Sequence, residues 1–242
     1  MIKGLALLWS TPCGFQLEHP DVRIWAQLTS IKIARDPRIE RFEIYNDNKV
    51  RIHCHRNAAA AKAIELGCDY LLFCDPDARP DCRAFNDRAP KDQQPHAAEW
   101  AKPFYESTLD FMLSNRAGVV AAPAVSQRPQ ESINVFLFRN DEPFSRMTHE
   151  ELETTPPQFL QVAAIGTHLM MVDVNVFRAL PQPWFEDLYE ADNKQIEIQQ
   201  SQDSVFCLKC TNAGFPVYAN LFAPAGHNKT DCLMPPLYKG AA

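Results

Sequence analysis

Apolar runs and helical segments alternate through the first 75 residues, and this alternation constrains the fold more than any other feature of the sequence. Apolar runs that end at turn residues predict strands, and segments with helical spacing or many alanines predict helices. The predicted strands span residues 2–9, 42–45 and 70–74, and the predicted helices span residues 20–36 and 56–66. Because strands joined by helical crossovers pair in parallel, we expect an α/β fold with a mainly parallel central sheet and helices on both faces. Ligands of such sheets bind beyond the carboxyl ends of the strands.

The second half of the chain continues this pattern after a polar stretch at residues 79–103, whose four prolines predict a surface excursion. The further predictions are a helix at residues 106–115, strands at 119–122 and 133–138, an apolar run at 162–172 and a helix at 202–213, with a polar stretch at 140–158. No internal repeat or low-complexity linker divides the chain. A single domain over residues 1–242 is therefore expected.

The composition excludes several classes of protein. Hydrophobic residues make up 46% of the chain and charged residues 22%, which excludes a disordered or coiled-coil protein. The net charge of -6 argues against a surface that coats duplex nucleic acid or an anionic membrane. No apolar run is long enough to cross a bilayer or to act as a secretory signal. The chain has eight cysteines, and those in apolar stretches, such as Cys68, Cys74 and Cys207, are typical of packed, reduced thiols, so a cytoplasmic protein is predicted.

Two short motifs could bind metal, but other interpretations are preferred. Cys207 and Cys210 have C-x-x-C spacing, yet a structural zinc site needs four ligands and the sequence has no second such pair. Packing on one helix face is therefore expected. His53, Cys54 and His55 form a denser cluster, but on a strand the cysteine would point away from both histidines, which argues against a shared metal.

Two aspartates at the end of a predicted strand give the strongest functional signal. The apolar strand at residues 70–74 is followed by Asp75 and Asp77. Two carboxylates held close together repel each other unless a cation lies beside them. Hard divalent cations take oxygen ligands and keep positions free for phosphate, which is what a diphosphate leaving group requires. An ordinary Asp-Pro-Asp surface turn is the alternative.

The residues around this pair resemble the GT-A fold glycosyltransferases, most closely the family-2-like enzymes. Arg56 and Asn57 match an R-N pair at the start of a helix in that family, and Asp75 and Asp77 match its Asp-x-Asp after the central strand. The resemblance implies a nucleotide-sugar-binding half at about residues 1–82, in which the Asp-x-Asp binds Mn²⁺ or Mg²⁺ together with the sugar nucleotide.

The second half, about residues 104–232, is similar to the acceptor-binding and catalytic half of the same family. The similar segments are Gly166 to Val172, Pro183 to Phe185, Ser201 to Cys207, and Gly214 to Tyr218 with the Gly226-His227 pair that follows. The third segment resembles the E-D-x-x-F-C helix start of the family, with Gln202 in place of the usual glutamate and Asp203 at the matching aspartate. His227 resembles the histidine that completes metal coordination in many members.

The resemblance implies a role for each matched position. The metal ligands would be Asp75, Asp77 and His227. The donor would contact both aspartates and Thr11, Asn46, Asp47, Arg56 and Asn57. The acceptor side would hold Gly166, His168, Trp184 and Gln202. Asp203 would accept the proton of the attacking hydroxyl, which gives inversion at the sugar carbon. A UDP-sugar is the first choice of donor and a GDP-sugar the next. The acceptor could be a glycan, a lipid-linked sugar, a protein, a small molecule or modified DNA.

Alternatives remain open for the residues and for the function. Asp203 could be a helix-capping residue, His168 a core histidine, Trp184 a packed aromatic and His227 a surface-loop residue. A non-catalytic module that binds a sugar nucleotide or a glycan is one alternative function. A sugar nucleotidyltransferase is another, although that class opens with a glycine-rich phosphate loop and a basic residue, whereas residues 10–14 contain one glycine and no basic residue.

Overall fold

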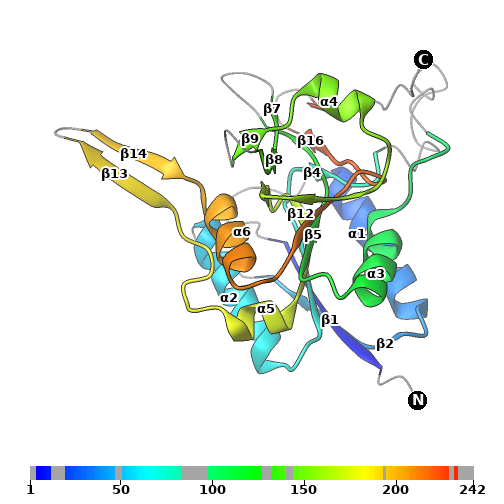
Figure 1. The fold of residues 1–242 in the computed structure, drawn as a ribbon. Helices are drawn as coiled ribbons and strands as arrows, with labels where there is room; N and C mark the ends of the chain where they lie inside the picture. The colour runs from blue at the N-terminus through cyan, green and yellow to red at the C-terminus, as the bar shows by residue number, and fades with distance from the viewer. Residues whose placement is uncertain are drawn as a thin grey trace.

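A seven-stranded sheet runs through the centre of the protein (Figure 1). The computed structural model describes residues 4–11, 20–46, 51–82, 98–126, 132–139, 144–192, 195–228 and 232–233. In spatial order the strands of the sheet are β10 (Phe159–Val162), β15 (Val217–Asn220), β5 (Val119–Ala121), β12 (Leu169–Asp173), β3 (Tyr70–Cys74), β1 (Leu5–Ser10) and β2 (Ile39–Tyr45). Strands β1, β2, β3, β5 and β15 run in one direction, and β10 and β12 run against them. The predicted α/β fold with a mainly parallel sheet is confirmed.

Helices cover both faces of this sheet, as expected (Figure 1). One face carries α1 (Pro20–Arg35) and α3 (Phe104–Asn115), and the other carries α2 (Ile52–Glu65), α5 (Val174–Ala179) and α6 (Gln202–Asn212). Each face has its own hydrophobic core. Leu71 and Phe73 of β3 pack into one core and the residues between and beside them into the other. Burial on both faces explains why this strand is a continuous apolar run.

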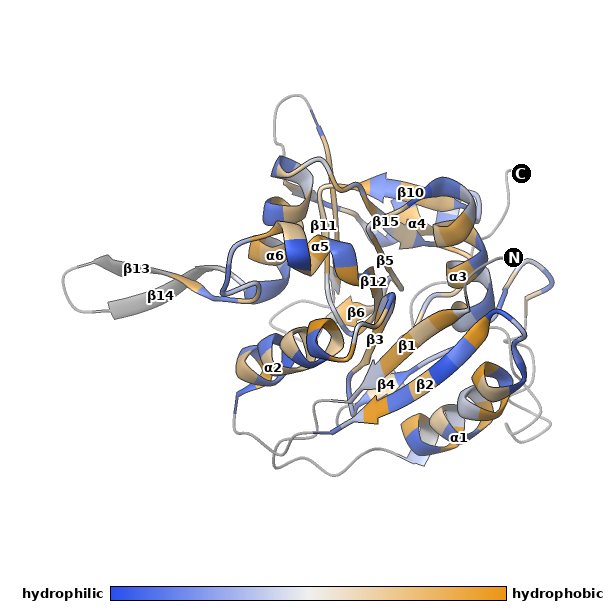
Figure 2. Cartoon of the chain, turned by 90° about the horizontal axis from the view of Figure 1, so that it is seen from below, coloured by the Kyte–Doolittle hydropathy of each residue, from blue (hydrophilic) through white to orange (hydrophobic). Residues whose placement is uncertain are grey.

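The edge of the sheet differs from its centre. Hydrophobic residues concentrate in the central strands, whereas hydrophilic residues interrupt the edge strand β2 (Figure 2). Glu40, Arg41 and Glu43 lie in this strand. Charged residues on an edge strand oppose pairing with another chain, which fits the position of β2 at the end of the sheet.

The two ends of helix α2 differ in how well the sequence signals them. The helix begins at Ile52 and not at Arg56 as predicted. Arg51, the residue before it, has extended backbone and makes no side-chain cap, so the sequence carries no capping signal for this end of the helix. The C-terminal ends of α2 and α6 agree with the predictions. Gly67 and Gly214 follow them with φ angles of 64° and 83°, a left-handed conformation that glycine adopts without strain.

The second half contains more short elements than predicted. The polar stretch at residues 140–158 contains β9 (Ser145–Arg146) and α4 (His149–Thr154). A capping box begins α4, since the amide of Glu151 donates to Thr148 Oγ1 and the amide of Thr148 donates to Glu151 Oε2. The other short strands are β6 (Val125–Ser126), β7 (Ser132–Ile133), β8 (Val135–Leu137) and β11 (Ala164–Ile165). The apolar run at 162–172 therefore divides among β10, β11 and β12.

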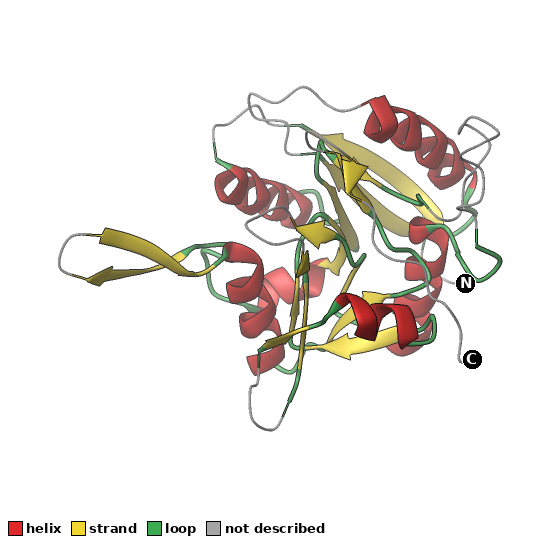
Figure 3. Cartoon of the chain, turned by 90° about the horizontal axis from the view of Figure 1, so that it is seen from above, coloured by secondary structure: helices red, strands yellow, loops and turns green. Residues whose placement is uncertain are grey.

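Two of the smaller sheets lie outside the central sheet, and one of them projects from the protein. Strand β4 (Ala78–Arg79) pairs with β16 (Gly226–Asn228), which pairs with β17 (Cys232–Leu233). Strands β13 (Leu188–Asp192) and β14 (Gln195–Gln200) form a hairpin that projects away from the remaining elements (Figures 1 and 3). This hairpin leads directly into α6.

Cys207 and Cys210 are free cysteines and are buried in the core beneath α6 as expected. Residues 53–55 lie in α2 and not on a strand. His55 contacts Ser10 Oγ through Nε2 at 2.7 Å, and His53 lies 3.8 Å from Asp187, so these histidines do not share a ligand site with Cys54. In the described part of the chain, no helix has the length and hydrophobicity needed to cross a membrane.

Asp81 joins the two helices on one face of the sheet. Its Oδ2 accepts a hydrogen bond from Trp25 Nε1 of α1, and its Oδ1 accepts one from the amide of Phe104, the first residue of α3, both at 2.6 Å. The side chain is only 3% exposed. Burial raises the pKa of Asp81 to about 6, and the two hydrogen bonds limit this rise.

The raised pKa of Asp81 predicts that the contribution of this residue to the free energy of unfolding falls as the pH rises from 4 to 7. The folded state holds the proton more tightly than the unfolded state, so this contribution is present below the unfolded pKa and is lost as the pH passes the folded pKa. A shift from 3.8 to about 6 corresponds to about 3 kcal/mol at most. Urea titrations across this pH range measure the slope.

Asp81→Asn is expected to flatten this pH dependence. The variant loses stability at every pH because its amide nitrogen faces one of the two donors, so the slope and not the absolute stability is informative. Glu99→Gln, at an exposed carboxylate, serves as the control and should keep the wild-type slope. Equal slopes in the wild type and Asp81→Asn would contradict the assignment.

Candidate functional site

The antiparallel strand β12 brings its first residues to the carboxyl end of β3. Leu169 pairs with Cys74, the last residue of β3, and the amide of Asp75 donates to the carbonyl of His168 at 2.8 Å. Because β12 runs against β3, the residues that precede β12 lie beside those that follow β3. Thr167 and His168 therefore lie at the edge of the sheet where the Asp-x-Asp was predicted to act.

A buried arginine links three elements at this edge. Arg56 of α2 is 2% exposed, and its Nη2 donates to both carboxylate oxygens of Asp75 at 2.9 and 3.0 Å. Its Nη1 donates to Asp203 Oδ1 of α6 at 2.8 Å. Burial lowers the pKa of Arg56, but the two carboxylates outweigh it and the net shift is upward. Burial likewise raises the pKa of Asp75, and the Arg56 guanidinium and His168 outweigh it, so the net shift is downward. The carboxylate of Asp75 is therefore held ionised.

Asp203 is positioned by side-chain contacts and does not cap its helix. Besides the bond from Arg56, its Oδ1 accepts a hydrogen bond from Thr167 Oγ1 at 2.6 Å. The N-cap residue Ser201 makes no side-chain cap, and the amide of Gln202 instead donates to Asp187 Oδ1 at 2.9 Å. The capping role that the sequence left open for Asp203 thus belongs to Asp187. The side chain of Asp203 is 28% exposed, so a ligand can reach it.

Asp77, His168 and His227 form a compact group of possible metal ligands. His227 Nε2 lies 3.2 Å from Asp77 Oδ2, and His168 Nδ1 lies 3.9 Å from Asp77 Oδ1. One ligand atom from each residue lies within 4.8 Å of the others. In the described residues, this is the group of histidine, cysteine and carboxylate side chains that fits a metal ion. A carboxylate with two imidazoles is a donor set that divalent metals use, so these residues fit a metal.

Main-chain carbonyls orient both imidazoles of this group. His168 Nε2 donates to the carbonyl of Gly226 at 3.0 Å, and His227 Nδ1 donates to the carbonyl of Val125 at 3.1 Å. The other nitrogen of His227 faces Asp77, and that of His168 lies between Asp77 Oδ1 at 3.9 Å and Asp75 Oδ2 at 3.7 Å. Burial lowers the pKa of His168, but Asp75, Asp77 and the Gly226 carbonyl outweigh it and raise the pKa above its ordinary value.

The group differs from the metal ligands implied by the resemblance. Asp77 and His227 lie together as expected, and the surface-loop alternative for His227 does not hold because it lies in β16. Asp75 does not belong to the group: its Oδ2 lies 3.7 Å from His168 Nδ1, but both of its carboxylate oxygens accept hydrogen bonds from Arg56. His168, placed on the acceptor side by the resemblance, lies in the group instead.

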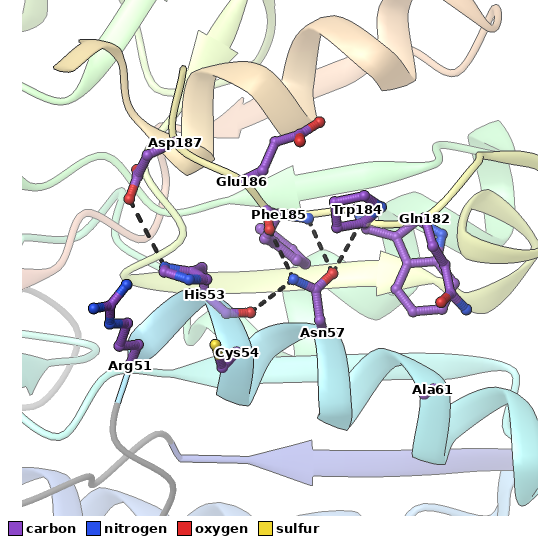
Figure 4. Close-up of a pocket in the computed structure, with 11 residues that line it drawn as sticks. Arg51, His53, Cys54, Asn57, Ala61, Gln182, Trp184, Phe185, Glu186 and Asp187 are labelled. Atoms are coloured by element: carbon purple, nitrogen blue, oxygen red, sulfur yellow. Dashed lines mark hydrogen bonds and ion pairs between the residues drawn. The ribbon is translucent and has the colours of Figure 1, made fainter. Parts of the chain in front are cut away.

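Asn57, expected near the donor, holds the backbone of a neighbouring loop (Figure 4). Its Nδ2 donates to the carbonyls of His53 and Phe185, and its Oδ1 accepts from the amides of Trp184 and Phe185. Trp184 is 3% exposed, and its Nε1 donates to the carbonyls of Phe177 and Leu180. The packed-aromatic alternative describes Trp184, and neither residue is carried into the proposed site.

A hollow of about 700 Å³ lies between α2 and this loop. Its lining residues, drawn as sticks in Figure 4, are Arg51, His53, Cys54, Asn57, Ala61 and residues 182–187. The hollow does not include Asp77, His168 or His227. The hollow therefore lies beside α2 and is separate from this group of possible metal ligands.

The remaining residues that were predicted for the site differ in their surroundings. Thr11 is 4% exposed and accepts a hydrogen bond from Trp9 Nε1 at 3.0 Å, and Asn46 is exposed after β2. Asp47 lies outside the described residues. Gly166 allows close approach to Asn134, whose Nδ2 would lie 2.5 Å from an added Cβ. Gln202 is 8% exposed and its Oε1 has no hydrogen-bond partner among the described residues.

Two residues that the sequence did not single out support the site. Thr167 binds Asp203, and Asp187 caps the helix that carries it. Thr167 lies between two residues that were predicted, so its position next to Gly166 and His168 was a usable signal. Asp187 had no such signal, because its partner is an amide 15 residues away across the hairpin.

The sequence matches no known family model, and no curated protein shows significant similarity to it. The solved structures that match this chain include the following two. A197 from STIV has a TM-score of 0.55 at 14% sequence identity, with 96% of this chain and 91% of that chain covered. GalNAc-T7, solved with UDP, GalNAc and Mn²⁺, has a TM-score of 0.47 at 10% identity, with 94% of this chain and 44% of that chain covered. The first shows a shared overall fold, and the second is too distant to support an argument about this chain.

The buried arginine predicts a large loss of stability on its removal. Arg56→Met leaves Asp75 and Asp203 without their shared cation, and breaking a buried ion network in this way costs about 3–5 kcal/mol. Urea unfolding measures the loss. Arg51→Met changes an exposed arginine beside the same helix and should cost less than about 0.5 kcal/mol.

A triple variant tests whether the unpaired carboxylate charges cause the loss of stability. Adding Asp75→Asn and Asp203→Asn to Arg56→Met removes the unpaired carboxylates and should recover part of the loss. A loss below about 1 kcal/mol in Arg56→Met, or no recovery in the triple variant, would show that the network does not organise this edge.

Proposed function

We propose that this protein is a divalent-cation-dependent glycosyltransferase that moves a sugar from a nucleoside-diphosphate sugar, with UDP the first choice of nucleotide, to an acceptor hydroxyl with inversion. One observation carries the proposal. A candidate cation group and a partly exposed carboxylate held by a buried arginine meet at the carboxyl end of β3, the edge where such sheets bind ligands. The resemblance of the Asp-x-Asp and Ser201–Cys207 segments to GT-A glycosyltransferases gives this arrangement its reaction class.

The donor would bind with its diphosphate at Asp77, His168 and His227. A divalent cation held there supplies a positive charge that offsets the charge growing on the departing diphosphate. Arg56 has a different task from the one implied by the resemblance. Because both of its terminal nitrogens are occupied by carboxylates and it is 2% exposed, it positions Asp75 and Asp203 and does not contact phosphate.

Asp203 would be the general base. Arg56 and Thr167 hold its Oδ1, and no described residue donates to its Oδ2. The free oxygen can accept the proton of the acceptor hydroxyl as the hydroxyl oxygen bonds to the anomeric carbon. The bond from that carbon to the diphosphate oxygen breaks on the opposite face, which inverts the configuration. The fixed carboxylate contributes through orientation as well as proton transfer.

The first test concerns the donor. UDP is expected to raise the melting temperature of the protein in the presence of Mn²⁺ and to have little effect with EDTA, because the cation and the diphosphate bind together. Asp77→Ala should weaken Mn²⁺-dependent UDP binding at least about tenfold by isothermal titration calorimetry. Glu99→Ala, at an exposed carboxylate, is the control. Binding of neither UDP nor GDP, or unchanged affinity in Asp77→Ala, would overturn the proposal.

A second test separates catalysis from donor binding. Asp203→Asn keeps an oxygen for Arg56 and Thr167 but cannot accept a proton, so transfer or donor hydrolysis should fall about 10² to 10⁴-fold. UDP affinity should stay within about threefold of the wild-type value. Thr167→Ala keeps the base but loses one of its two bonds and should give an intermediate rate. If Asp203→Asn retains the wild-type rate, Asp203 is not the base. If the wild type binds UDP-sugars and never turns them over, the chain is the non-catalytic module instead.

A further inference from the structure

We propose that the cation centre of this protein consists of Asp77, His168 and His227, without Asp75, and that it selects a divalent transition ion over Mg²⁺ and Ca²⁺. The catalytic use of this centre rests on the proposed function, whereas the binding of the ion does not. The centre therefore departs from an Asp-x-Asp pair in which both carboxylates face the cation.

The orientation of the two histidines is the first argument. Each ring gives one N–H to a main-chain carbonyl, of Gly226 for His168 and of Val125 for His227. A neutral imidazole with one nitrogen protonated presents a lone pair at the other nitrogen. Carbonyl acceptors of this kind are the usual means by which proteins fix a metal-binding histidine. His227 Nε2 faces Asp77, and His168 Nδ1 lies near both Asp77 and Asp75, but the ligand atoms that converge within 4.8 Å of one another come from Asp77, His168 and His227.

The surrounding strands hold these ligands in place. Pairing of β4 with β16 sets His227 opposite Ala78, the residue that follows Asp77. Pairing of β12 with β3 sets His168 beside Asp75, and His168 is 6% exposed. Ligand atoms bound to one small divalent ion at about 2.1 Å are about 3 to 4 Å apart. The separations are 3.2 Å from His227 Nε2 to Asp77 Oδ2 and 3.9 Å from His168 Nδ1 to Asp77 Oδ1, and one ligand atom from each residue lies within 4.8 Å of the others, so an ion can bind once the three side chains move closer together.

The engagement of Asp75 is the second argument. Both of its oxygens accept hydrogen bonds from Arg56 Nη2, and Arg56 is held in turn by Asp203. A carboxylate in contact with a guanidinium is a poor ligand, because the arginine already neutralises its charge. Removing Asp75 from the centre leaves one carboxylate and two nitrogens.

This donor set determines which ion binds. Mg²⁺ and Ca²⁺ prefer oxygen ligands, and a single carboxylate offers them little. Imidazole suits transition ions such as Fe²⁺ and Zn²⁺, and the affinity of a given site with nitrogen and oxygen ligands rises from Mn²⁺ through Fe²⁺ and Co²⁺. Two histidines with one carboxylate are a known arrangement for such ions. The remaining coordination positions stay available to water or to the oxygens of a diphosphate.

The test uses the full-length protein and metal ions alone, without nucleotide. Isothermal titration calorimetry of the metal-free protein should show one Mn²⁺ site and at least about tenfold weaker binding of Mg²⁺ and Ca²⁺. His168→Ala and His227→Ala should each weaken Mn²⁺ binding at least about tenfold. Asp75→Asn is the matched variant and should keep the affinity within about threefold. Circular dichroism verifies that each variant is folded.

A spectroscopic measurement on the wild type keeps the proposal falsifiable if a histidine variant does not fold. Pulsed electron paramagnetic resonance of the Mn²⁺-loaded protein should show coupling to the ¹⁴N nuclei of two imidazoles. Absence of nitrogen coupling, equal affinity for Mg²⁺ and Mn²⁺, or a loss in Asp75→Asn as large as in His168→Ala would overturn the proposal. Intact Mn²⁺ binding without any UDP binding would remove the proposed function and leave this centre standing.

Discussion

The ionic contacts of Arg56 organise the site more than any other interaction in the molecule. A buried guanidinium needs carboxylate partners, and here they come from positions 19 and 147 residues away in the chain. Three elements, α2, the end of β3 and the start of α6, must therefore meet for the charge to be compensated. Buried ion networks add little net stability compared with apolar packing. We interpret this one as a device that fixes geometry, because each bond orients a carboxylate that the proposed chemistry needs.

The antiparallel strand β12 is the second constraint. In a wholly parallel sheet the residues preceding a strand lie at the edge opposite the carboxyl ends of its neighbours. Because β12 runs against β3 and β5, its leading residues Thr167 and His168 lie at the carboxyl edge instead. The two residues before β12 thus have separate contacts: Thr167 donates a hydrogen bond to Asp203, and His168 provides a nitrogen of the candidate cation group. The short pairing of β4 with β16 adds His227 from the far end of the chain.

Much of the fold could be predicted from the sequence, because its signals are local. Buried strands such as Tyr70–Cys74 are continuous apolar runs, and glycines mark the ends of α2 and α6. The start of α2 could not be placed, since Arg51 gives no capping signal. The order of strands and the antiparallel direction of β12 depend on long-range pairing, which no local pattern encodes.

The residues of the candidate site could be predicted from the sequence better than the contacts that these residues make. Asp75, Asp77, Asp203 and His227 were singled out, and the structure places all four at one edge. The partners were not predictable, because they depend on which side of the sheet each residue faces. Asn57 accepts hydrogen bonds from the amides of Trp184 and Phe185, and His168 lies in the candidate cation group. Both arrangements depend on how α2 and β12 pack, which the sequence alone does not show.

The division of labour between two aspartates two residues apart follows from charge. If Asp75 and Asp77 both bound the cation, Arg56 would lose a partner that its burial requires, and Asp203 alone would have to balance it. With Asp75 assigned to Arg56, the arginine and its two carboxylates carry a net charge of about −1. Asp77 and two neutral imidazoles leave a bound divalent ion with a net charge of about +1. In the proposed transfer, the positive charge of the cation group faces the diphosphate, and the negative charge of the Arg56 network faces the proton of the acceptor hydroxyl. Because the two aspartates belong to different groups, each charge lies where the proposed reaction requires it.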